Sequence, residues 1–219
     1  MKTIFHFLKS LAANNNREWF QANRQLYDQA REEFEAVAEK MIEEIGAFDP
    51  DVAGIPVKDT LYRIYRDVRF SNDKSPYKTH LGCYINPKGK KSQHGGYYLH
   101  IEPGGCGVAG GAYCLEGPVL KAVRRSIVDR IDEYRSIVEN PEFKALFPVI
   151  GMERLKTLPA GFDRSFPYPD YIRPKDYSTW HSLPDSFFLK KGWEKEAAKE
   201  FRILKPFLDF INDTVDDYI

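Results

Sequence analysis

The segment Arg63–Lys78, which reads RIYRDVRFSNDKSPYK, opens the β-rich part of the chain. A β-favouring run from Leu61 to Phe70 carries its charges on alternate positions, and it stops at a Ser-Asn-Asp cluster that turns the chain. Successive strand residues point to opposite faces, so this run predicts a wet face and a core face. The wet face would hold Arg63, Tyr65, Asp67 and Arg69, and the core face Tyr62, Ile64, Arg66, Val68 and Phe70.

Three further β-rich segments follow, and Gly or Pro bounds each of them: residues 79–86, 96–102 and 106–115. No helical pattern separates these segments, whereas a parallel crossover needs about a dozen residues or more. We therefore predict an α+β fold. It consists of an antiparallel β-meander sheet of four or more strands, packed against long amphipathic helices in a single domain.

Apolar residues spaced three or four positions apart predict the helices that cover this sheet. One helix is expected from Asp28 to Gly46 and another from Val119 to Glu139. The end of the chain, Gly192–Tyr218, reads as a helix pair or as one helix kinked at Pro206. Residues 155–189 are rich in Pro and aromatic residues, and we expect an irregular wrap there with one or two edge strands.

The length of 219 residues suits one domain, 1–219, whose core is large enough to be stable without disulfide bonds or a structural metal ion. Within it we expect N-terminal helices in 1–48, the sheet with the basic segment in 58–116, and helices in 117–147. Residues 148–219 would form the irregular wrap and the C-terminal helices.

Lys plus Arg equals Asp plus Glu, 32 of each, so no overall field draws the protein to nucleic acid or to anionic lipid. Any binding of a polyanion must then come from a local patch. Residues 61–91 provide one, because they hold eight Lys or Arg and only two Asp or Glu.

The three cysteines, Cys83, Cys106 and Cys114, are an odd number without metal-type spacing, and the N-terminus does not resemble a signal peptide. No apolar stretch approaches the roughly 20 residues that span a bilayer. We expect a cytoplasmic protein without a membrane partner.

The basic segment is the predicted binding site. Asp67 could hold Arg63 and Arg69 in fixed poses and leave guanidinium donors free for an incoming anion. Two alternatives stay open: ion pairs on a solvated strand, or a catalytic site that needs these arginines. If the site exists, its cations should converge on one cleft. The predicted ligand-binding residues are Arg63, Arg66, Arg69, Lys74, Tyr77 and Lys78.

His100 and Glu102 share one strand face with Tyr98, and they could join Asp67 in a general acid/base or metal cluster. These three residues, Asp67, His100 and Glu102, are the catalytic candidates. The five histidines show no metal-binding spacing, so we expect no metal site and no cofactor.

Four sequence stretches resemble the family known as domain of unknown function 2461, a group of conserved hypothetical proteins of bacteria and fungi. These stretches are Asn15–Phe20 (NNREWF), Arg66–Lys78 (RDVRFSNDKSPYK), Gly96–Pro103 (GYYLHIEP) and Leu155–Lys175. The last departs from the family pattern at Arg173-Pro174-Lys175. The resemblance spans nearly the whole chain and implies one conserved domain, but it implies no activity.

The leading functional hypothesis is a binding module for a phosphate- or carboxylate-bearing ligand at the basic segment. The ligand could also be a nucleic acid, because tyrosines alternate with the cations in this part of the chain. In proteins that bind single strands, bases stack on such aromatic rings and cations bind the phosphates. One alternative is an enzyme acting on a phosphorylated or nucleic-acid substrate, with arginines that stabilise anionic charge. Another is a protein-interaction domain whose basic segment docks an acidic partner.

Overall fold

The computed structural model describes residues 1–218, and the chain forms two compact units. Each unit combines segments that are distant in sequence. The first unit comprises Met1–Lys90, Tyr98–Val108 and Ser182–Ala198; the second comprises Lys91–Tyr97, Ala109–His181 and Lys199–Ile219. The expected boundaries of one domain over residues 1–219 stay a prediction.

Four strands form one antiparallel sheet in the order β1-β2-β3-β4. They are β1 (Leu81–Ile85), β2 (Gly96–Ile101), β3 (Gly107–Ala112) and β4 (Tyr177–Ser182). The first three are the predicted meander, and β4 is an edge strand from the segment predicted as an irregular wrap. The α+β prediction is therefore confirmed.

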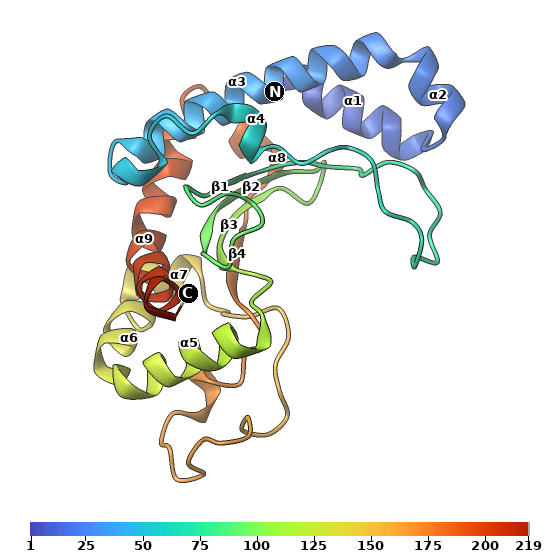
Figure 1. Ribbon diagram of the computed structural model, residues 1–219. Helices are drawn as coiled ribbons and strands as arrows, with labels where there is room; N and C mark the ends of the chain where they lie inside the picture. Colours follow the sequence, from blue (N-terminus) through green and yellow to red (C-terminus); the bar gives the residue numbers. More distant parts are fainter. Residues whose placement is uncertain (219) are drawn as a thin grey trace. The chain divides into compact units, whose positions relative to one another are not determined.

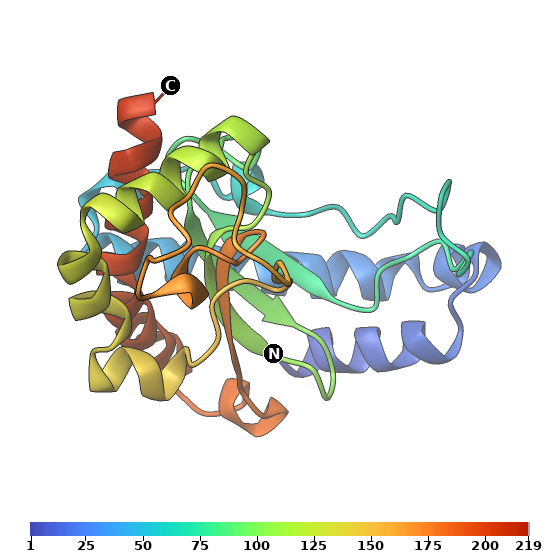
Figure 2. The same cartoon turned by 90° about the horizontal axis from the view of Figure 1, so that it is seen from below.

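The segment Leu61–Phe70 was expected to be a strand, and this is wrong. Among the described residues, its β-pairing is limited to two isolated antiparallel bridges, Leu61 with Cys83 and Tyr65 with Tyr77. It belongs to a long loop, residues 61–80, that leads into β1 and is drawn in teal in Figures 1 and 2.

The prediction that Tyr62, Ile64, Arg66, Val68 and Phe70 form a buried face is also wrong. Ile64 is buried, but Tyr62 is 41% exposed and Phe70 is 96% exposed. The pattern misled because a strand needs a continuous partner, whereas this loop turns back on itself and is held by ion pairs within it.

The first unit begins with α1 (Lys2–Ala13), α2 (Arg17–Ala22) and α3 (Arg24–Gly46). Helices α1 and α3 lie side by side, with their buried residues spaced as the apolar stripes predicted (Figure 1). Asn16 caps α2 by accepting a hydrogen bond from the Trp19 amide at 2.9 Å. The unit also holds the short helices η1 (Pro50–Val52), α4 (Val57–Thr60) and α8 (Asp185–Phe188).

The second unit contains α5 (Gly117–Asp129), α6 (Ile131–Val138), α7 (Pro141–Leu146) and η2 (Pro169–Tyr171). The single helix predicted over 119–139 is thus two helices. Arg130 breaks it, since its backbone leaves the helical region and its guanidinium binds Glu133 and lies 4.5 Å from the ring centroid of Phe210.

Helix α9 (Trp193–Tyr218) begins in the first unit and continues in the second. Pro206 lies inside it, but the buried stripe runs past the proline from Phe201 and Leu204 to Phe207 and Ile211. This burial offsets the hydrogen bond that a proline removes from a helix.

Gly110 shows how tightly this helix lies on the sheet. A Cβ atom at Gly110 would stand 2.2 Å from Cδ2 of Leu204 and 2.9 Å from the carbonyl oxygen of Gly96. The glycine here therefore serves packing.

Candidate functional site

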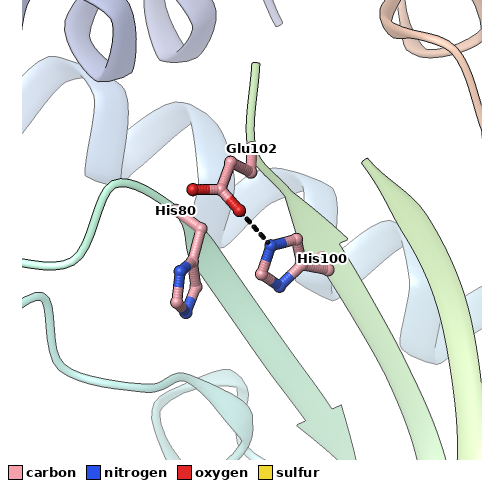
Figure 3. A group of neighbouring side chains, drawn as sticks. All are labelled: His80, His100 and Glu102. Atoms are coloured by element: carbon pink, nitrogen blue, oxygen red, sulfur yellow. Dashed lines mark hydrogen bonds and ion pairs between the residues drawn. The ribbon is translucent and has the colours of Figure 1, made fainter. Parts of the chain in front are cut away.

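The most distinctive polar cluster lies on one face of β1 and β2, within the first unit (Figure 3). The odd-numbered residues of both strands are buried, as in Cys83 and Leu99. Strand alternation therefore turns the even-numbered side chains to the other face, where they are only partly buried. These side chains include His80, Tyr98, His100 and Glu102.

A chain of hydrogen bonds joins the members of this cluster. The Tyr98 hydroxyl lies 2.9 Å from Nδ1 of His100, and Nε2 of His100 lies 3.1 Å from Oε2 of Glu102. The Thr79 hydroxyl donates to the other oxygen of Glu102, Oε1, at 2.6 Å. The expected grouping of Tyr98, His100 and Glu102 on one face is confirmed, and each side chain is held by its neighbour.

His80 adds a second imidazole to the cluster. Its ring centroid lies 4.3 Å from that of His100, with an angle of 31° between the rings (Figure 3). One ligand atom from each of His80, His100 and Glu102 lies within 4.8 Å of the other two. Among residues 1–218, no hydrogen bond is made by the His80 ring.

Gly82 creates the space for Tyr98. A Cβ atom at position 82 would stand 2.6 Å from the Tyr98 hydroxyl oxygen and 2.9 Å from its Cε2 atom. Only a residue without a side chain lets this ring lie across β1 and reach His100.

Burial sets the charge of the cluster. Burial, with a smaller contribution from the neighbouring His100, lowers the pKa of His80 to about 4. Burial also lowers the pKa of His100, although the hydrogen bond that His100 donates to the Glu102 carboxylate acts in the opposite direction. For Glu102, burial favours the neutral acid, but the hydrogen bonds from Thr79 and His100 outweigh it and lower the pKa. At neutral pH the cluster is one carboxylate beside two uncharged imidazoles.

Sequence reasoning missed His80, although a signal was present. It alternates with the buried Leu81 and Cys83, which puts it on the partly buried face of its own segment, and the pairing of β1 with β2 then brings that face beside His100. Asp67 was expected in this cluster instead. Its carboxylate is held within the loop by Arg69, at 2.6 and 2.9 Å, and this hydrogen bonding lowers its pKa to about 2.

The structure divides the predicted ligand-binding cations into two groups. Three of them bind acceptors inside the loop. Arg66 pairs with Asp73, Arg69 with Asp67, and the Lys74 ammonium donates to the carbonyl oxygen of Val68 at 3.0 Å. Their charge is largely satisfied locally.

Arg63 and Lys78 form the other group. Among the described residues, neither side chain has a carboxylate partner within ion-pair distance. Lys78 is partly buried, and both burial and the charge of Arg63 lower its pKa. Its ammonium lies 5.3 Å from the ring centroid of Tyr62.

Tyr62 connects these cations to the histidine cluster. Its ring stands edge-on to Tyr98 with centroids 6.1 Å apart, and Lys90 lies on it at 5.6 Å. The charge of Lys78 also acts directly on His80. Lys78 and Lys90 thus border the cluster on the side of Tyr62, and Arg63 is near enough to Lys78 for its charge to lower the pKa of that residue.

Tyr77, also predicted to bind the ligand, is 3% exposed and stacks on Phe20 with ring centroids 4.0 Å apart. This position makes it a core residue of the first unit. Tyr77 therefore anchors the loop of residues 61–80 to the core of the first unit.

The second unit contains a separate cavity of about 160 Å³. Tyr134, Arg154 and Tyr171 are among its lining residues, and none of the predicted site residues is. The hydroxyl of Tyr171 in its wall donates to Glu139 at 2.5 Å.

A family model described as "Conserved hypothetical protein (DUF2461)" matches residues 3–210. The chain therefore belongs to this family. No curated protein and no solved structure matches it. Within residues 1–218, no helix is both long and apolar enough to cross a membrane.

Proposed function

We propose that this member of the family binds an anionic ligand, one that carries a phosphate or a carboxylate, beside the histidine cluster of the first unit. The ligand would lie against Arg63 and Lys78 and on the ring of Tyr62. The protein would act in the cytoplasm, a location supported by its three free cysteines.

The observation that carries this proposal is the environment of Lys78. Its partly buried ammonium has Arg63 for a neighbour, and among residues 1–218 no carboxylate lies within ion-pair distance of it. Two neighbouring cations that lack an ion-pair partner repel each other, and a bound anion would relieve that repulsion. The other cations of the segment lack this property because they are paired within the loop.

The same loop provides matched controls for the test. Lys78→Ala and Lys74→Ala each remove one ammonium, and Arg63→Ala and Arg69→Ala each remove one guanidinium. We expect Lys78→Ala and Arg63→Ala to weaken binding about 10- to 100-fold, the value of one charge-assisted contact of about 1.5 to 3 kcal/mol. Lys74→Ala and Arg69→Ala should leave binding nearly unchanged.

Binding is measured as the rise in melting temperature produced by inorganic phosphate, a mononucleotide, succinate and a short oligonucleotide, all in EDTA. Preference for the oligonucleotide would identify nucleic acid as the ligand class. The proposal is wrong if no compound stabilises the parent protein. It is also wrong if all four variants lose the same amount of ligand-induced stabilisation.

A second candidate function is an enzyme acting on a phosphorylated substrate. His100 donates a hydrogen bond to Glu102 that orients its imidazole, as a general base requires, and Arg63 and Lys78 would stabilise developing negative charge. A phosphatase or esterase activity that His100→Gln abolishes, while the melting temperature is kept, would favour this function.

A further inference from the structure

We infer that His80, His100 and Glu102 form a binding site for a divalent transition-metal ion, of which Zn²⁺ is the simplest candidate. The inference does not depend on anion binding. It differs from the expectation drawn from histidine spacing, because the ligands come from the end of one segment and from a neighbouring strand and so leave no sequence motif.

The ligand types fit such an ion. Two imidazoles and one carboxylate are a common protein set for zinc when one coordination position stays open. Calcium and magnesium prefer sites made only of oxygen atoms, so a site with two nitrogen ligands selects against them.

The distances also fit. Two ligands of a tetrahedral zinc ion, each bound at about 2.0–2.1 Å, lie about 3.4 Å apart. Nε2 of His100 and Oε2 of Glu102 are 3.1 Å apart, so an ion can replace the hydrogen bond between them with little movement. The third ligand atom, on His80, lies within 4.8 Å of both.

His80 can close the remaining distance at small cost. Its ring makes no hydrogen bond to residues 1–218, so a modest rotation breaks none. A histidine–carboxylate pair that served structure alone would need no second imidazole. His181 and Glu200 make such a pair at 2.7 Å, and among the described residues no third metal-binding side chain approaches them as His80 approaches His100.

Two hydroxyl groups hold the ligands from behind. Thr79 donates to Oε1 of Glu102 and leaves Oε2 facing the histidines. Tyr98 contacts Nδ1 of His100, and its hydroxyl can either donate to this nitrogen or accept from it. When Nδ1 carries the proton, Nε2 presents its lone pair to the ion. Outer hydrogen bonds of this kind accompany most protein metal sites.

Three protein ligands leave at least one position for water or for an oxygen atom of a ligand. Lys78 lies 5.3 Å from the ring centroid of Tyr62, and that ring packs edge-on against Tyr98, so an anion bound to Lys78 would lie on the Tyr98 side of the cluster.

The test is metal uptake by the full chain after EDTA treatment and desalting, without phosphate. Equilibrium dialysis against Zn²⁺ with elemental analysis should give one ion per chain, and Mg²⁺ should not be retained. Co²⁺ should give the visible absorption bands of a site with nitrogen and oxygen ligands. His80→Ala and Glu102→Gln should each lower Zn²⁺ affinity by about 10-fold or more.

His6→Ala is the matched control, because it removes an exposed histidine of the same unit and should change nothing. Circular dichroism and a melting curve establish that each variant is folded, and His80→Asn replaces His80→Ala if the latter is not. If the parent protein takes up no Zn²⁺, or if folded His80 and Glu102 variants bind it as tightly as the parent, the inference is wrong.

The metal and anion results can be told apart. Zinc uptake without any stabilising anion would reject only the proposed function. Anion binding in EDTA that depends on Lys78, without zinc uptake, would reject only the metal site.

Discussion

The side-chain amide of Asn15 holds the backbone of Tyr77 at both ends. Its Nδ2 donates to the carbonyl oxygen of Tyr77 at 2.9 Å, and the Tyr77 amide donates to Oδ1 of Asn15 at 3.1 Å. Two of the sequence stretches that resemble the family, Asn15–Phe20 and Arg66–Lys78, therefore meet in space. This contact fixes the chain one residue before Lys78, and so it positions the proposed anion site.

Asn15→Ala should lower the free energy of unfolding by about 1 to 3 kcal/mol, because it removes two hydrogen bonds worth about 0.5 to 1.5 kcal/mol each. Urea unfolding followed by circular dichroism measures the change. Asn14→Ala is the control, since Asn14 makes one exposed bond to Ser10. Equal losses in the two variants would show that the Asn15–Tyr77 contact contributes nothing specific.

Phe20→Ala should lower the free energy of unfolding by about 3 to 5 kcal/mol, because the ring is fully buried and stacks on Tyr77. Phe70→Ala should change stability by less than about 0.5 kcal/mol, because Phe70 is 96% exposed. Chemical denaturation of both variants checks this pair. A large loss in Phe70→Ala would instead support the core face that the sequence predicted for Leu61–Phe70.

Gly82→Ala should destabilise the protein by about 1 to 3 kcal/mol, the usual cost of an added methyl group in a packed site. The new methyl would displace the Tyr98 ring and break its contact with His100. Thermal melting measures the loss, and the imidazole resonances of His100 in NMR spectra should shift.

Gly117→Ala is the control for this substitution, because the residue is helical and, within residues 1–218, no atom outside its chain neighbours and its own helix backbone lies within 4 Å of the added Cβ. Wild-type stability and unchanged His100 resonances in Gly82→Ala would disprove the packing of Tyr98 over Gly82.

Two of the three thiols should resist a disulfide reagent at pH 8. Burial raises the pKa of Cys83 and of Cys106 to about 12, so both stay protonated, and the thiol form is unreactive. Cys114 is exposed and should react quickly. A spectroscopic thiol count should find one fast group in the folded protein and three after denaturation. Rapid reaction of all three without denaturant would contradict this assignment.

The residue pattern alone predicts the long helices, apart from the break at Arg130, and three strands of the meander. Their signals are local, since apolar residues every three or four positions require a helix and Gly or Pro between short β-rich runs requires turns. The grouping of Tyr98, His100 and Glu102 was equally local, because alternation along one strand decides it.

Tertiary structure decided what the charged residues do. The composition of Arg63–Lys78 does not show that Arg66, Arg69 and Lys74 bind acceptors inside the loop, because this depends on how the loop folds back. Strand pairing across the sheet, which one segment alone does not specify, brought His80 to His100. The absence of a partner strand left Phe70 in solvent, because a β-rich pattern gives a strand only when another segment supplies its hydrogen bonds.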